Sequence, residues 1–90
     1  MTANTLPAPD LAAAAEVVTL ASGVVATGVK TLATTGGPDV QQVLAYDIAH
    51  AAAQVETARA LLPYGAKGDV EARITCAFAA DMAHDLISRL

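Results

Sequence analysis

The sequence predicts an all-α protein, a three-helix up-down-up bundle around an alanine-rich core. Three observations support this fold class. The 90 residues contain three apolar runs of helical length, and clusters of glycine and proline separate these runs. Within each run, apolar residues recur at spacings of three and four, which is the period of an α-helix. Hydrophobic residues make up 54% of the chain, and much of that share is alanine, the strongest helix former.

The first helix is expected at residues 11–33, after a flexible tail at residues 1–9. Asp10 is a typical N-cap residue, and the Gly36-Gly37 pair is suited to the C-terminal end of the helix. A strand within residues 23–29 is the competing interpretation, because glycines and β-branched valines lower helix propensity there. The expected packing seam of this helix consists of Leu11, Ala15, Val18, Ser22, Val25, Val29 and Leu32.

The second helix is expected at residues 38–62. Pro38 suits its first turn, where a missing N–H costs nothing, and Asp39 complements the positive end of the helix dipole. Pro63 is expected to end or kink the helix. The expected core stripe consists of Val40, Val43, Leu44, Ile48, Ala51, Ala52, Val55, Ala58 and Leu62.

The third helix is expected at residues 69–90, with Asp69 and Glu71 at its positive end. A second apolar face over its first half predicts burial there on two sides, through Val70, Ile74, Ala77 and Phe78. Its long face consists of Ala72, Cys76, Ala79, Ala80, Ala83, Leu86, Ile87 and Leu90. No glycine, asparagine or proline marks the end of this helix. We therefore interpret residues 10–90 as one helical domain, a fragment or N-terminal part of a longer protein.

Charge and composition disfavour several classes of partner. The net charge is −4, with nine acidic and five basic residues, which disfavours binding to nucleic acid. The run at residues 11–33 is long enough to span a membrane, but Glu16 and Lys30 argue against a span, and no basic n-region precedes it. Cys76 is the single cysteine, which fits a reducing, cytoplasmic location. A structural role for Cys76 is favoured over a reactive thiol.

A short polar signature, Asp-x-Ala-His, occurs twice, as Asp47–His50 and as Asp81–His84. An acid and a histidine at this spacing share a helix face and could bind a metal ion, as in di-iron bundles. Such bundles need two further carboxylates from other helices, and the first helix offers only Glu16. The alternatives are a general acid–base pair, structural histidines, or two polar stripes that face solvent or a partner. We favour the polar stripes, and predict no catalytic, cofactor-binding or metal-binding residue in this chain.

The turn at residues 65–68 precedes a helix and could hold an anion at the helix N-terminus. Asp69 and Glu71 follow it directly and would repel an anion. A plain interhelical turn is therefore expected.

Four ordered strings resemble a known family. They are TTGGPD at residues 34–39, VLAYDIAHAAA at 43–53, YGAKGDVEARI at 64–74 and CAFAAD at 76–81. Together, over about residues 32–90, they resemble the helical extension that precedes the core of actinobacterial-type acyl-CoA dehydrogenases. The resemblance implies an FAD-dependent parent that oxidises the Cα–Cβ bond of an acyl-CoA thioester. None of the strings is a catalytic motif, so no flavin-contacting residue or catalytic base is placed here. Pro63 departs from the family's pattern.

Two functions follow as expectations. The first is an accessory helical segment of an acyl-CoA dehydrogenase-like flavoprotein, which serves packing or subunit contact and is not catalytic alone. The second is an independent helical interaction or oligomerisation module with no enzyme attached. The expected partner is either the remainder of a larger dehydrogenase or a second copy of the chain.

Overall fold

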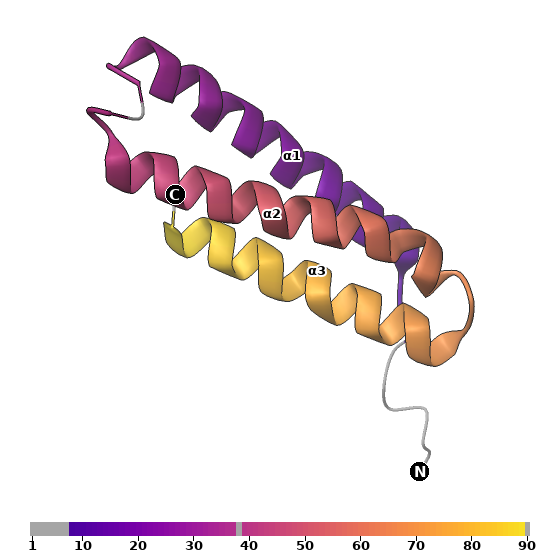
Figure 1. The fold of residues 1–90 in the computed structure, drawn as a ribbon. Helices are drawn as coiled ribbons and strands as arrows, with labels where there is room; N and C mark the ends of the chain where they lie inside the picture. The colour runs from indigo at the N-terminus through magenta and orange to yellow at the C-terminus, as the bar shows by residue number, and fades with distance from the viewer. Residues whose placement is uncertain (1–7, 38, 90) are drawn as a thin grey trace.

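The computed structural model is a bundle of three α-helices and describes residues 8–37 and 39–89. The helices are α1 (Leu11–Thr34), α2 (Gln42–Gly65) and α3 (Asp69–Arg89). They run up, down and up, with α3 beside both other helices (Figure 1). The all-α fold class is therefore confirmed. The competing strand at residues 23–29 is wrong, because α1 is continuous through this stretch. Pro38, Leu90 and most of the expected tail lie outside the described residues.

The two ends of α1 form as the sequence predicts. Asp10 caps the helix, because its Oδ1 accepts a hydrogen bond from the Ala13 amide at 3.0 Å. At the other end, the Gly37 amide donates to the Leu32 carbonyl at 2.9 Å. Gly36 and Gly37 have φ angles of 112° and 76°, a region that residues with a side chain rarely adopt. The glycine pair therefore turns the chain away from α1.

The expected start of α2 at residue 38 is wrong, since the helix begins four residues later at Gln42. Before it, the amides of Val40 and Gln41 donate to the Gly37 carbonyl at 3.3 and 3.0 Å in a separate turn. Asp39 is exposed in this turn and lies outside the first helical turn. No side chain caps α2 at Gln41.

The expected end of α2 at Leu62 is also wrong, because the helix continues through Pro63 to Gly65. Proline lacks the N–H that would bond four residues back, but this loss falls in the last turn, where few bonds follow. The amides of Ala66 and Lys67 then donate to the carbonyls of Pro63 and Tyr64 at 3.2 and 3.1 Å. These shorter-range bonds close the helix end despite the proline.

A buried threonine joins the end of α2 to α3. Thr75 is 1% exposed, and its single hydroxyl hydrogen is shared between the Leu61 carbonyl of α2, at 3.1 Å from Oγ1, and the Glu71 carbonyl, at 2.8 Å. Gly65 lies against this residue, and a Cβ at Gly65 would stand 2.7 Å from Thr75 Oγ1. The close approach of the two helices therefore needs a glycine here.

The core is narrower than the sequence pattern suggests. Its buried cluster consists of Val18, Ala21, Ala51, Val55, Ala58, Met82 and Leu86. Thr75 and Met82 are the most deeply buried side chains of α3, and neither belongs to the expected faces. In a three-helix bundle each helix is covered on only the two sides that meet its neighbours. Several large apolar residues of the expected seam, core stripe and second apolar face are instead exposed, among them Val29, Val40, Val43, Val70 and Ile74.

The expectation that the first half of α3 is buried on two sides is therefore wrong. Val70 is 66% exposed and Ile74 is 46% exposed. Ile87, on the expected long face, is 81% exposed. The chain folds around a small core and leaves large apolar side chains in contact with solvent.

Candidate functional site

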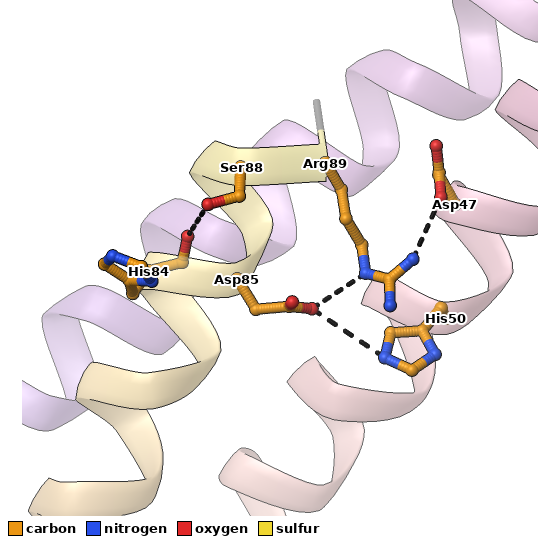
Figure 2. Close-up of polar contacts among 6 residues, drawn as sticks. All are labelled: Asp47, His50, His84, Asp85, Ser88 and Arg89. Carbon is orange, nitrogen blue, oxygen red and sulfur yellow. Dashed lines mark hydrogen bonds and ion pairs between the residues drawn. The ribbon is translucent and has the colours of Figure 1, made fainter.

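A polar cluster joins α2 to the end of α3. Arg89 Nη1 donates to Asp47 Oδ1 at 3.0 Å, and Arg89 Nε donates to Asp85 Oδ2 at 2.9 Å. His50 Nε2 lies 3.7 Å from Asp85 Oδ2. Figure 2 shows Asp85 between Arg89 and His50, with Asp47 on the far side of the guanidinium. The cluster thus alternates acidic and basic groups across the interface.

The first Asp-x-Ala-His element contributes to this cluster and the second does not. Asp47 and His50 face α3, whereas Asp81 and His84 are exposed, and His84 points away from the cluster (Figure 2). The side chains that meet Asp47 and His50 are Asp85 and Arg89. No pattern in the sequence predicted that Asp85 and Arg89 would take this role. The two repeated elements therefore do not form one site.

Among residues 8–37 and 39–89, no group of three or more His, Cys, Asp or Glu side chains lies close enough together to hold a metal ion. The cation in the cluster is instead Arg89, which already pairs with both carboxylates. A positive guanidinium between two carboxylates occupies the position that a metal ion would need.

The electrostatics of the cluster suit structure better than proton transfer. The hydrogen bond from Arg89 holds the pKa of Asp85 below its ordinary value, with partial desolvation opposing this effect and the charge of Arg89 and His50 adding to it. The same hydrogen bond raises the pKa of Arg89. A carboxylate with a lowered pKa is a weak general base at neutral pH. The cluster therefore ties α3 to α2.

Acidification is expected to weaken this tie. Because the pKa of Asp85 is lower in the folded chain, its contribution to stability is present above the unfolded value of 3.8 and is lost as the pH falls through the folded value. In urea unfolding followed by circular dichroism, Asp85→Asn is expected to lower the midpoint at pH 7. The difference in urea midpoint between Asp85→Asn and the parent chain should become smaller below about pH 4. An equal difference in midpoint at pH 7 and pH 3 would contradict a stabilising role for ionised Asp85.

A second candidate feature is an apolar groove between α1 and α3. One part, of about 220 Å³, is lined by Val17, Leu20, Ala21, Val24, Ala83, Leu86 and Ile87. A further hollow of about 450 Å³ lies nearer the start of α1, between Asp10 and Ala14 on one side and Arg73, Cys76 and Ala80 on the other. Cys76 is partly buried there. The residues that line the 220 Å³ part are all apolar, so this part of the groove offers few groups for chemistry and much surface for packing.

Among the described helices, α1 alone is long and apolar enough to cross a membrane by length and composition. Core helices of soluble proteins and signal sequences share these properties. Ala14, Val18 and Ala21 pack α1 into the bundle, although 17% of the apolar stretch is buried. The sequence-based expectation that the chain has no membrane span stays a prediction.

No protein-family model, curated protein or solved structure matches this chain. The likeness to acyl-CoA dehydrogenases therefore depends on the four short strings alone, and the structural features above must carry any functional argument.

Proposed function

We propose that this chain is an accessory helical segment that packs against other polypeptide and is not catalytic alone. The single observation that carries the proposal is the apolar groove between α1 and α3, with Leu20 70% exposed and Ile87 81% exposed at its rim. Large apolar side chains gathered along one groove lose contact with water when another chain covers them. Each fully covered side chain of this kind contributes about 1.5–3 kcal/mol.

The resemblance supplies the identity of the neighbour. On that basis the covering polypeptide is the core of an acyl-CoA dehydrogenase-like flavoprotein in the cytoplasm, and FAD belongs to that core. The charge-compensated cluster at Asp47, Asp85 and Arg89 supports a structural role, because it fixes the relative position of α2 and α3 beside the groove.

The test compares the isolated chain with the product of its whole reading frame. The frame is expected to continue into a flavin-binding core. In that product, Ile87→Ser should lower the melting temperature by several degrees. In the isolated chain, Ile87→Ser should change the free energy of unfolding by less than about 0.5 kcal/mol, because the side chain is already in solvent.

Val43→Ser is the matched control. Val43 is 78% exposed on α2, away from the groove, so this substitution should have little effect in either protein. A frame that ends at Leu90 would reject the dehydrogenase as neighbour, and equal effects of Ile87→Ser in both proteins would reject the groove as a packing surface.

The second candidate is an independent oligomerisation module. The exposed side chains of Glu16 and Lys30 on α1 favour this candidate, because an acid and a base on one helix face can pair with the same two residues of a second copy.

A further inference from the structure

We propose that a second copy of the chain packs antiparallel against the outer face of α1. This face lies opposite the core-facing residues of the helix and beside the groove, with which it shares Leu20 alone. The inference goes beyond the packing role proposed above, because the other groove residues, Ile87 among them, lie outside this face. The outer face consists of Ala12, Glu16, Thr19, Leu20, Gly23, Ala26, Thr27 and Lys30, all of them exposed.

The charges on this face select the partner. Glu16 and Lys30 are the only charged residues of α1. Neither side chain makes an ion pair or hydrogen bond with another part of residues 8–37 or 39–89. Each lies seven residues from Gly23, one before it and one after it. Seven residues are close to two helical turns, about 10.5 Å along the axis, so both charges lie on the same face as Gly23.

A two-fold axis at Gly23 therefore brings opposite charges together. In an antiparallel pair centred there, Glu16 of each copy lies opposite the partner's Lys30, which forms two equivalent ion pairs. A parallel pair in the same register would place Glu16 against the partner's Glu16. The arrangement of one acid and one base about the centre thus fits an antiparallel second copy.

The sizes of the side chains fit the same register. Gly23 lies at the centre of the pair, and an added Cβ would have no atom within 4 Å, so the backbones can approach closely there. Leu20, which is 70% exposed, falls opposite the partner's Ala26. A surface hollow of about 320 Å³ is lined by Ala15, Glu16, Thr19 and Leu20. The partner's Ala26 and the aliphatic part of its Lys30 face this hollow.

A lipid bilayer is the other occupant that an apolar helix could have. Contact with hydrocarbon would strip water from Glu16 and Lys30 without supplying opposite charges, whereas a second copy supplies both. Dimer formation and vesicle binding, measured on the same chain, distinguish a second copy from a bilayer.

Sedimentation equilibrium of the 90-residue chain tests the proposal. The parent chain is expected to form a dimer that weakens as salt rises. Glu16→Lys or Lys30→Glu alone should raise the dissociation constant by about tenfold, because two attractive pairs become repulsive. The double exchange Glu16→Lys with Lys30→Glu should restore it. A chain that is monomeric at every concentration, or single reversals without effect, would overturn the proposal.

A cross-link tests the register. In a Cys76→Ser background, Gly23→Cys lies on the two-fold axis and is expected to form a disulfide-linked dimer on mild oxidation. Ala53→Cys, at an exposed position on α2, is the matched control and should remain monomeric. Equal cross-linking of both variants would overturn the register. Binding to phosphatidylcholine–phosphatidylglycerol vesicles without dimer formation would overturn the second copy as occupant. These outcomes would overturn the proposed pairing of two copies, but they would not change the result expected for Ile87→Ser in the groove.

Discussion

Replacing Met82 with alanine is expected to remove most of the stability of the isolated chain. Met82 is 1% exposed and belongs to the buried cluster with Val18, Ala51, Val55 and Leu86. Truncation of such a side chain costs about 2–5 kcal/mol, since it loses buried surface and leaves a cavity. A domain of this length has a free energy of unfolding of the order of 5–10 kcal/mol, and an alanine-rich core places this chain toward the lower end.

Urea unfolding followed by circular dichroism at 222 nm measures the effect. Ile87→Ala, five residues further along α3, is the matched control. Ile87 is 81% exposed, so its truncation should cost less than about 0.5 kcal/mol in the isolated chain. If the two substitutions cost the same, the assignment of inner and outer faces of α3 is incorrect.

The second large effect is expected at the junction of α2 and α3. In Gly65→Ala, the new Cβ would lie 2.7 Å from Thr75 Oγ1 and 2.8 Å from Leu11 Cδ2. The Leu11 side chain can rotate away, but Thr75 is buried and its hydroxyl is bonded to the Leu61 carbonyl. Relief of the clash must move α3 or break that bond. We expect a loss of about 2 kcal/mol from overpacking.

Gly23→Ala is expected to stabilise the chain, whereas Gly65→Ala destabilises it, and it therefore serves as the control. An added Cβ at Gly23 meets nothing within 4 Å, and alanine is favoured over glycine in a helix interior by about 1 kcal/mol. At dilute protein, where the chain is monomeric, Gly23→Ala should raise the urea midpoint while Gly65→Ala lowers it. A stabilising effect of Gly65→Ala would show that the two helices do not meet closely at this point.

Features set by local chemistry could be predicted from the sequence. Asp10 caps α1, and Gly36 and Gly37 end it, because capping and left-handed backbone depend on a few neighbouring residues. The three helices themselves follow from hydrophobic period and the glycine and proline breaks. Pro63 shows the limit of such rules, since a proline in the last turn removes one hydrogen bond and leaves the helix in place.

Features set by the rotation and register of the helices could not be predicted. Thr75 and Met82 are the most buried residues of α3, although the apolar pattern favoured Cys76, Ala80 and Ala83. Which side faces inward depends on where α1 and α2 lie, and a wide band of small apolar residues allows several rotations.

The polar cluster shows the same limit. Only the metal-site interpretation of the repeated Asp-x-Ala-His elements, which we did not favour, would bring Asp81 and His84 beside Asp47 and His50. In the folded chain, the register of α2 against α3 brings Asp85 and Arg89 there instead. The spacing of four between Asp85 and Arg89 was the available signal, because it predicts a pair on one helix face. This spacing does not show which residues of α2 the pair contacts.

We infer that the apolar side chains that α1 and α3 leave in solvent are contact surfaces for other polypeptide. The most direct measurement is the methyl NMR response of Leu20 and Ile87 to a soluble paramagnetic agent, in the dilute isolated chain and in the native protein purified from its cells. We predict strong relaxation of both methyl groups in the dilute chain and shielding of both in the native protein. Equal relaxation of both residues in the two samples would contradict the claim.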